Sequence, residues 1–294
     1  MDQAEQLRNI IKAESQNKRP LARIITVTSG KGGVGKSNTS INLAIQLRKM
    51  GQRVIIMDAD FGLANIEIMF GTIPKYNLSD LIYQGKDIKE IITWGPGEVG
   101  FISGGSGIVG LSNLRREYLA YIVQNLAKLD AIADIIIIDT AAGISDAVLE
   151  FLVASGEILV VTTPEPTSIT DSYSLLKELN RHPRYVPENT RIKVITNRIE
   201  TREEGKTLFN KLNAVVSRYL NLSIEHIGTI PYDSQITESV IQQTPVSMLN
   251  PKARSSLAYE EIAATLMNKE LNKNLRKRGM AAFFSHIVSG KKTG

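Results

Sequence analysis

Short runs of branched apolar residues alternate along the chain with longer segments in which apolar positions recur at helical spacing. The short runs lie at residues 23–29, 53–60, 134–139, 157–162, 191–196 and 226–230. The helical segments lie near residues 37–44, 113–129, 145–154, 168–180, 204–220 and 253–272. Runs that are apolar at nearly every position are typical of strands buried on both faces, and this alternation is typical of parallel sheets. The pattern therefore predicts a single α/β domain built on a doubly wound, mostly parallel sheet with helices on both faces.

A glycine-rich loop lies between the first predicted strand and the first predicted helix. It reads Gly30, Lys31, Gly32, Gly33, Val34, Gly35, Lys36 and Ser37, followed by Asn38. Glycines let successive backbone N–H groups turn inward and the helix N-terminus adds a positive end, so such a loop binds polyphosphate. We expect all of these residues to contact a nucleotide, with Lys36 on the β- and γ-phosphates and Ser37 on a Mg2+ ion. The strand before the loop and the helix after it disfavour the alternative, a plain turn with two solvated lysines.

Lys31 stands one residue after the opening glycine, where most phosphate loops have no lysine. It lies on the far side of the loop from Lys36, so its ammonium group is free to reach phosphates bound by a neighbouring subunit. The position of this lysine predicts a homodimer formed with ATP, in which two chains face each other across two nucleotides.

Acidic residues follow two of the apolar runs, Asp58 and Asp60 after one and Asp139 at the end of another. Ligands of parallel sheets bind beyond the carboxyl ends of the strands. We therefore expect Asp58 and Asp139 at the metal ion, and Asp60 as the residue that orients or activates water for phosphoryl transfer. Gly143 could lend its N–H group to the γ-phosphate as part of a nucleotide-sensing segment. Taken alone, Asp58 and Asp60 could also be acids that cap a strand or a helix.

Two later segments are candidates for recognition of the adenine base. Asn197 and Arg198 follow the strand predicted at 191–196, and Pro231, Tyr232 and Asp233 follow the one at 226–230. The Asn197 amide could read the edge of the base, and the backbone near Tyr232 could contact it. The alternative is a polar residue that ends a strand, and a turn that precedes a helix.

Composition narrows the function classes. The chain has 294 residues, 43% of them hydrophobic, enough to bury a full core. It has no cysteine, which argues against disulfides, iron–sulfur clusters and thiolate zinc sites and fits a reducing cytoplasm. The three histidines are scattered and do not suggest a metal site. The net charge is +5, and residues 269–294, with seven basic residues and one acid, contribute +6 of it. The rest of the chain has a net charge of −1 and so no excess of cations for a polyanion, and DNA binding is therefore not expected.

The two ends of the chain carry amphipathic patterns. Near the N-terminus, Asp2 can cap a short helix whose apolar face includes Leu7, and residues 15–20 suggest a linker. Near the C-terminus, an apolar stripe follows the cations at 276–278; it consists of Met280, Phe283, Phe284, Ile287 and Val288. Such a stripe beside cations predicts attachment to an anionic membrane surface. The alternative is that the stripe packs against its own domain or a partner, and both could hold in different states.

Between about residues 23 and 266 the chain resembles the MinD/ParA family of deviant Walker A ATPases. The resemblance rests on Lys31, on Lys36 with Ser37, on the acids Asp58, Asp60 and Asp139, and on Asn197. Residues 60–65, 139–145 and 163–173 look most like the branch of the family that sets flagellar number and placement, called FlhG or YlxH, with MinD the next closest.

The resemblance implies a Mg2+-dependent ATPase, slow and stimulated by a partner, that cycles between ATP and ADP. It implies a division into an activator helix and linker at 1–20, an ATPase domain at 21–272 and a membrane-targeting tail at 273–294. In the flagellar branch the N-terminal helix binds the SRP-type GTPase FlhF, and Gln3, Leu7 and Arg8 are the matching positions. The resemblance also suggests flagellar switch-complex proteins as partners, and a cytoplasmic protein attached peripherally to the inner face of the cell membrane.

Other functions remain open at this point. The main alternative is an ATPase of the same family that marks the cell-division site or partitions chromosomes or plasmids. A partitioning ATPase would bind DNA, and the cations of the tail leave that possibility open. A metal-cluster carrier of the same fold would need cysteines. A nucleotide-dependent scaffold that does not hydrolyse ATP is disfavoured by the presence of both lysines and the three acids.

Overall fold

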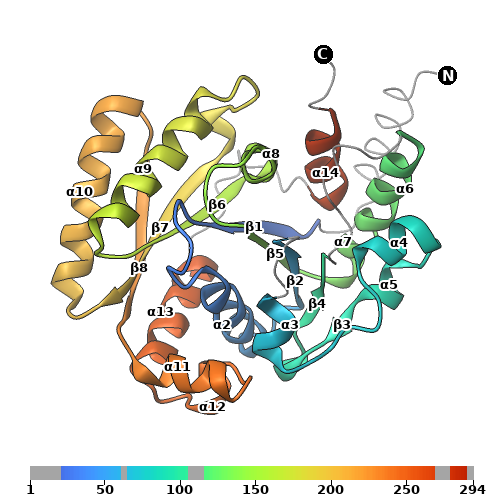
Figure 1. Ribbon diagram of the computed structural model, residues 1–294, viewed down its shortest axis with the longest axis horizontal. Coiled ribbons are helices and arrows are strands. Elements are labelled where there is room, and N and C mark those ends of the chain that lie inside the picture. Colours follow the sequence, from blue (N-terminus) through green and yellow to red (C-terminus); the bar gives the residue numbers. More distant parts are fainter. Residues whose placement is uncertain (1–20, 61–64, 105–115, 269–278, 290–294) are drawn as a thin grey trace.

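The computed structural model describes residues 21–60, 65–104, 116–268 and 279–289, and one eight-stranded sheet forms its centre (Figure 1). The strand order is β3-β4-β2-β5-β1-β6-β7-β8. The strands are β1 (Arg23–Thr28), β2 (Val54–Ala59), β3 (Thr93–Trp94), β4 (Gly100–Ile102), β5 (Ile135–Thr140), β6 (Glu157–Thr162), β7 (Arg191–Ile199) and β8 (Ile224–Pro231). All neighbouring strands pair in parallel except β3 and β4, so the prediction of a mostly parallel sheet is confirmed.

Helices cover both faces of the sheet, which confirms the doubly wound prediction. The long helices are α2 (Lys36–Lys49), α6 (Arg116–Ala127), α8 (Asp146–Ala154), α9 (Pro166–Arg181), α10 (Arg202–Leu220), α13 (Arg254–Asn268) and α14 (Gly279–Ser289). Shorter ones are α3 (Asn65–Phe70), α4 (Leu78–Gln84), α5 (Ile88–Ile91), α7 (Leu129–Ile132), α11 (Ser234–Ile241) and α12 (Val246–Leu249), with 3-10 turns at Pro96–Glu98 and Pro187–Asn189. Helices α2 and α13 lie on one face, and α4 to α10 with α14 lie on the other.

Strand β5 shows why a continuous apolar run becomes a central strand. Ile136 and Ile138 face the core under α6 and α14, while Ile135 and Ile137 face the core under α2 and α13. Because side chains alternate between the faces of a sheet, a strand with helices on both sides must be apolar at every position. The strand then ends in Asp139 and Thr140, at the edge where the loops gather.

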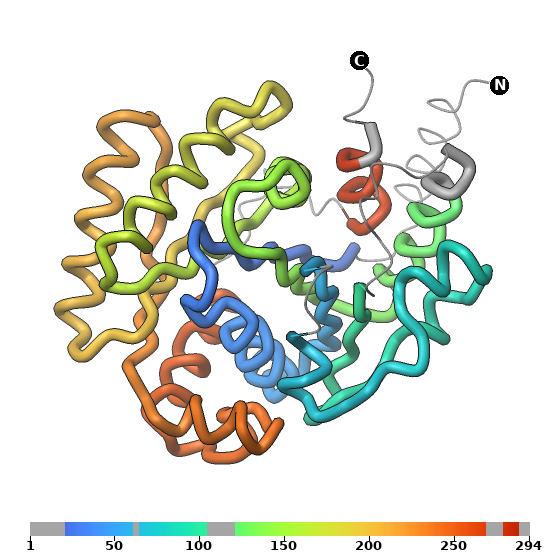
Figure 2. Tube along the Cα trace, viewed as in Figure 1, coloured from blue at the N-terminus to red at the C-terminus, as the bar shows by residue number. Residues whose placement is uncertain are grey.

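Helix α14 packs into the body of the protein. Met280, Phe283, Phe284 and Ile287 are all buried, and the helix lies against α6, α7, α8 and the start of β1 (Figure 2). The two phenylalanines also pack against the ring of Phe151 on α8. In this structure these four residues of the apolar stripe therefore face the core of their own domain and are not open to a membrane. The sequence left open whether this stripe binds a membrane or packs against its own domain, and in this structure these four residues pack against their own domain.

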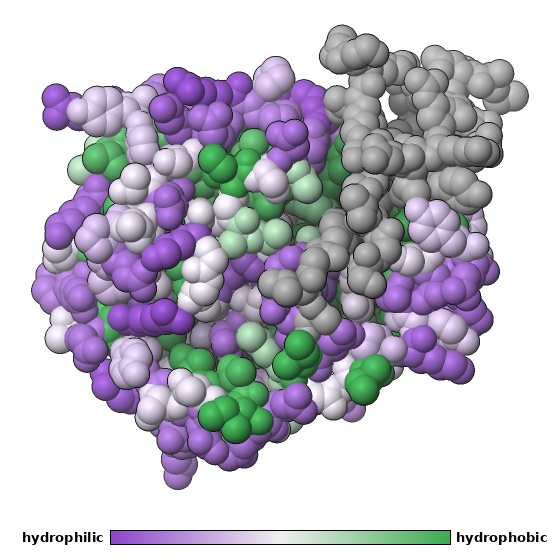
Figure 3. Space-filling view, in the orientation of Figure 1, coloured by the Kyte–Doolittle hydropathy of each residue, from purple (hydrophilic) through white to green (hydrophobic). Residues whose placement is uncertain are grey.

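Parts of the sequence predictions lie outside the described residues. These are the helix and linker predicted at 1–20, with Gln3, Leu7 and Arg8, the tail residues 273–278 and 290–294 with the cations at 276–278, and the side chain of Val288. No helix among the described residues combines the length and the apolar character that crossing a membrane requires. On the face viewed in Figure 3, apolar side chains are exposed over the region of α3 and α11. Ile68 on α3 and Ile241 on α11 are exposed to solvent.

Candidate functional site

The glycine-rich loop connects β1 directly to α2, in the strand, loop, helix order that the sequence predicted. Gly33 and Gly35 have φ angles of 76° and 91°, in the left-handed region that side chains disfavour. Gly35 is the N-cap of α2, no side chain caps the helix, and its first turn contains no acid. The loop and the helix N-terminus therefore present backbone N–H groups and a positive dipole without a competing anion, as an anion-binding site requires.

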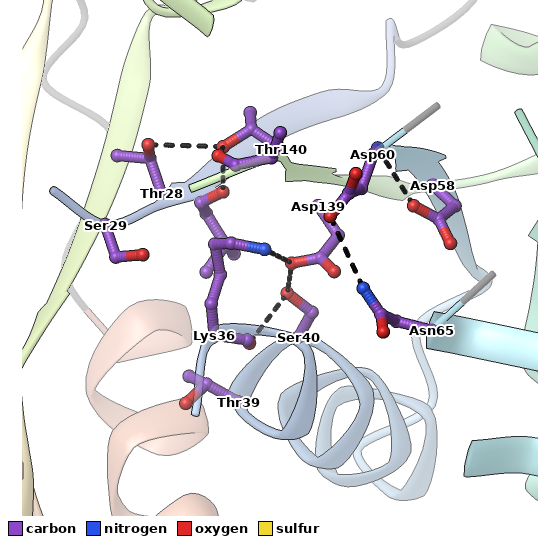
Figure 4. Close-up of polar contacts among 12 residues, drawn as sticks. Thr28, Ser29, Lys36, Thr39, Ser40, Asp58, Asp60, Asn65, Asp139 and Thr140 are labelled. Atoms are coloured by element: carbon purple, nitrogen blue, oxygen red, sulfur yellow. Dashed lines mark hydrogen bonds and ion pairs between the residues drawn. The ribbon is translucent and has the colours of Figure 1, made fainter. Parts of the chain in front are cut away.

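Lys36 and Asp139 meet beneath this loop (Figure 4). The Lys36 Nζ atom lies 3.4 Å from Asp139 Oδ1, and the Ser40 hydroxyl donates to the same oxygen at 2.8 Å. Asp139 is fully buried, and its Oδ2 atom has no hydrogen-bond partner among the described residues. A buried carboxylate oxygen without a donor is suited to a metal ion or to a water molecule that a metal ion holds.

Asp58 and Asp60 lie beside Asp139, because Asp58 is paired in register with Asp139 across β2 and β5. Asp58 accepts hydrogen bonds from the backbone N–H groups of Asp60, at 3.0 Å, and of Ile66 near the start of α3, at 3.5 Å. Burial, and secondarily the charge of Asp139, raise the pKa of Asp58 to about 8. Asp58 thus also caps the backbone after β2 and near the start of α3, which was the alternative that the sequence left open for this acid. Asn65 donates to Asp60 at 3.4 Å.

The Gly143 N–H group has a partner in its own chain. It donates to the carbonyl oxygen of Ser29 at 2.9 Å, although the sequence suggested that it would serve the γ-phosphate. Gly143 has a φ of 92°, and a Cβ atom at this position would have no neighbour within 4 Å. The contact ties the segment after β5 to the segment after β1, so Gly143 lies at the edge of the site.

The side chain of Lys31 reaches away from the site of Lys36. Its Nζ atom donates to Glu165 at 2.5 Å and to Thr167 at 2.9 Å, both at the start of α9. Lys31 and Glu165 are partly exposed, and Lys31 holds the pKa of Glu165 below its usual value. Lys31 therefore lies at the surface, held by a contact within its own chain.

The two segments proposed for adenine recognition have other contacts in this structure. The Asn197 amide donates to the Val34 carbonyl of the loop at 2.7 Å, and the Arg198 guanidinium donates to the Gly33 carbonyl at 2.7 Å. Asp233 caps α11 and accepts hydrogen bonds from Ser255. It therefore belongs to a turn that precedes a helix, which was the alternative to a contact with adenine. Pro231 ends β8, and Tyr232 is exposed beside it.

Sequence reasoning missed three residues of this site. Ser40 follows Lys36 by one helical turn on α2, and that spacing could have placed it beside Asp139. Glu165 and Thr167 follow β6, whose carboxyl end lies next to β1. Their position after a strand end was a usable signal, but their contact with Lys31 depends on how β6 and β1 are paired.

Three comparisons with known proteins agree with this geometry. A profile of the ParA family, described as NUBPL iron-transfer P-loop NTPase, matches residues 20–267. The antiactivator FleN of Pseudomonas aeruginosa is 38% identical over 273 residues, which cover 92% of this chain and 95% of FleN. The flagellum site-determining protein YlxH of Helicobacter pylori is 32% identical over 270 residues, 90% of each protein. MinD of Pyrococcus horikoshii, complexed with Mg-ADP, has the same fold, with a TM-score of 0.65 and 21% identity over 84% of this chain and 97% of its own.

The fold and the site define a P-loop nucleotide-binding protein, because a glycine loop on a helix N-terminus faces acids at the ends of neighbouring parallel strands. The matches narrow this class. The chain belongs to the MinD/ParA family of P-loop ATPases, and its cofactors are ATP and Mg2+. The donors present fit that ion, since Mg2+ prefers oxygen ligands and Asp139 offers a buried carboxylate oxygen beside Lys36, the residue that precedes Ser37. When bound, Mg2+ neutralises charge on the phosphates.

Proposed function

We propose that this ATPase regulates the number and placement of flagella. The observation that carries the proposal is the match over nine-tenths of the chain to an antiactivator FleN and to a flagellum site-determining protein. The chain has no cysteine, so the thiolates that a carrier of iron–sulfur clusters uses are missing, although the matching family profile is named for iron transfer. The output of such an ATPase is its own position in the cell.

ATP-dependent pairing is the first step of the proposed cycle. Lys31 is exposed at the side of the phosphate loop, where a second copy could approach it, and Lys36 is buried beneath the same loop. The contact between Lys31 and Glu165 is weak because both side chains are partly solvated. A triphosphate carried by a partner chain would offer Lys31 a stronger, more highly charged acceptor.

Hydrolysis resets the cycle in this proposal. Asp139 and Ser37 would hold Mg2+, Asp60 would orient the attacking water, and Asp58 would keep Asp60 in place through the hydrogen bond to its N–H group. Asp60 directly follows β2 and lies beside Asp139 (Figure 4), so in this proposal it would stand next to the carboxylate that holds the ion.

Membrane attachment requires that α14 first leave the body. Its buried side chains contribute about 1.5–3 kcal/mol each in their present position, so moving them into lipid exchanges one apolar environment for another. The cations at 276–278 add about 1 kcal/mol each at an anionic surface. One released helix is therefore a weak anchor, and two helices on an ATP-bound dimer bind much better because the second insertion is intramolecular. On this basis the protein is cytoplasmic and attaches reversibly to the inner face of the cell membrane.

The N-terminal segment provides the test of the flagellar assignment. We propose that Gln3, Leu7 and Arg8 belong to a helix that binds the SRP-type GTPase FlhF. The purified chain of 294 residues should retain FlhF in a pull-down, and a chain that lacks residues 1–18 should not. If the 294-residue chain fails to retain FlhF while it still hydrolyses ATP, the flagellar assignment is wrong and a division-site or partitioning role, as in the MinD relatives, replaces it.

A further inference from the structure

The two carboxylate oxygens of Asp139 have different surroundings. The Oδ1 atom accepts a hydrogen bond from the Ser40 hydroxyl at 2.8 Å and lies 3.4 Å from the Lys36 Nζ atom. The Oδ2 atom has no hydrogen-bond partner in the part of the chain that the structure describes. Ser40 and Asp139 are both 0% exposed, so bulk water does not reach the bond between them. Helix α2 therefore holds one oxygen of this carboxylate and leaves the other without a donor.

Ser40 is the more firmly placed of the two groups at Oδ1. We expect Lys36 to bind the β- and γ-phosphates, and its flexible side chain can turn toward them. Ser40 has a single side-chain torsion and stands one turn into α2, so its hydroxyl keeps its place when Lys36 moves. This hydroxyl also lies 3.2 Å from the Lys36 carbonyl, but it has only one hydrogen to donate. The carboxylate is closer and charged, so it is the stronger acceptor.

A second carboxylate stands beside Asp139. Asp58 is paired in register with Asp139 on the neighbouring strand β2, so both side chains stand on the face of the sheet that α2 covers. Both oxygens of Asp58 accept hydrogen bonds from backbone N–H groups. Of the four oxygens of this pair, Asp139 Oδ2 is thus the one without a donor among the described residues. Two buried carboxylates side by side favour a cation, and Oδ2 is the oxygen that can accept it.

We propose that Ser40 is a positioning residue for the Mg2+ ion. It holds Asp139 Oδ1 when Lys36 turns to the phosphates, and so it keeps Oδ2 directed to the ion or to water that the ion holds. Without the hydroxyl, the carboxylate group can rotate about its last torsion, which is broad, and neither oxygen keeps a fixed direction. This role for Ser40 goes beyond the proposed function and holds whether or not the protein acts on flagella.

The gain in ADP affinity that Mg2+ brings is the quantity that tests this role. Calorimetric titrations of ADP into the 294-residue chain, with Mg2+ and with EDTA, give two dissociation constants, and their ratio is the gain. Ser40→Ala should lower the gain by up to about tenfold, the lower range for loss of a group that orients a metal ligand. The affinity in EDTA should stay close to that of the wild type, because the phosphate loop is unchanged. Ser40→Cys fills a similar volume with a much weaker donor, so it should lower the gain as well.

Ser256→Ala is the matched control. Ser256 is also 0% exposed on a helix, α13, but its hydroxyl donates to the backbone carbonyls of Val246 and Asn250. This variant should keep the wild-type gain, and urea unfolding without nucleotide checks that each variant is folded. A wild-type gain in both Ser40 variants would overturn the proposal, as would the absence of any gain in the wild type. An equal loss of ADP affinity with and without Mg2+ would also overturn it, because Ser40 would then support the phosphate loop and not the ion.

Discussion

At the scale of single residues, the site is built from side chains that each have more than one contact. One carboxylate oxygen of Asp139 accepts a hydrogen bond from Ser40 and lies near Lys36, and its other oxygen has no hydrogen-bond partner among the described residues. Both carboxylate oxygens of Asp58 accept hydrogen bonds from backbone N–H groups. The same residue type therefore serves two purposes at neighbouring strand ends. Asp139 is suited to contact the cofactor, and Asp58 is suited to hold the segment that carries Asp60.

Asp60→Ala should lower the turnover number by about 100-fold, the lower range for loss of a group that transfers or orients a proton. Nucleotide affinity should stay close to that of the wild type, because the lysine and the backbone of the phosphate loop are untouched. Steady-state phosphate release and an ADP titration measure the two quantities. Glu203→Ala, which removes an exposed acid on α10, is the control for a change in charge alone. Turnover equal to that of the wild type in Asp60→Ala would remove Asp60 from the reaction.

The residue types of the site could be predicted from the sequence, but several of their partners could not. The loop, Lys36 and the acids follow strands whose apolar runs are long enough to recognise. The contacts of Lys31 with Glu165 and of Asn197 with Val34 join residues more than 130 positions apart. Such contacts depend on which strands are neighbours, and the sequence pattern does not give the order of β1, β6 and β7.

At the scale of elements, the sequence pattern missed the strands β3 and β4 and did not decide what covers helix α14. Strands β3 and β4 have two and three residues, too short to show a period, and they exist because they extend the sheet beyond β2. Helix α14 shows a different limit. An apolar helical face is equally suited to lipid and to a protein core, so the stripe predicted a buried face without saying what covers it.

The docking of α14 is held at its start by Asp130 on α7. This carboxylate accepts from the N–H group of Met280 at 3.1 Å and from that of Ala22 at 3.3 Å. Gly279 has a φ of 63°, and a Cβ atom there would lie 2.5 Å from Asp130 Oδ2. At the other end, Arg184 donates to the His286 carbonyl at 2.6 Å and pairs with Glu150. Both ends of the helix are therefore fixed by side chains from the body.

Replacement of Asp130 and of Phe283 should change membrane binding in opposite directions. Asp130→Ala removes the hydrogen bonds that hold α14 but leaves its apolar face intact, so more protein should pellet with anionic liposomes in ATP. Phe283→Ala removes part of the face that both the core and the lipid use, so it should lower pelleting and also cost about 3 kcal/mol of stability. Co-sedimentation in ATP and in ADP, with urea unfolding, measures both effects. If both variants pellet like the wild type in either nucleotide, α14 is not a membrane anchor.

The contribution of Asp130 to stability should depend on pH. Burial raises its pKa from 3.8 to about 6, so between these values the folded protein binds the proton and the unfolded chain does not. The resulting stability is present below pH 4 and is lost as the pH rises through 6. The free energy of unfolding of the wild type, minus that of Asp130→Asn, should therefore fall by up to about 3 kcal/mol between pH 4 and 7. Urea titrations across this range measure it, and a constant difference would show that Asp130 does not titrate in this way.

At the scale of the whole molecule, the loops that carry the site all lie at one edge of the sheet. The phosphate loop follows β1, Asp60 follows β2, Gly143 follows β5 and Glu165 follows β6. The strand order places β2, β5, β1 and β6 side by side, so these loops follow one another along the same edge of the sheet (Figure 1). An edge that carries the phosphate loop, the partly buried Asp60 and a partly exposed Lys31, above the buried Asp58 and Asp139, is suited to meet a second copy of itself, since a two-fold dimer uses the same patch on both chains.

Lys31→Ala should abolish the ATP-dependent pairing that we propose, while it preserves the nucleotide site within each chain. Lys31 contacts Glu165 and Thr167, whereas Lys36 lies against Asp139, so the substitution leaves the buried network unchanged. Light scattering with a nonhydrolysable ATP analogue should give twice the mass of one chain, 32.4 kDa, for the wild type and a single mass for the variant. Lys206→Ala, which removes an exposed lysine on α10, should pair like the wild type. If Lys31→Ala pairs as well as this control, the lysine does not act across the dimer, and its contact with Glu165 is only a surface ion pair.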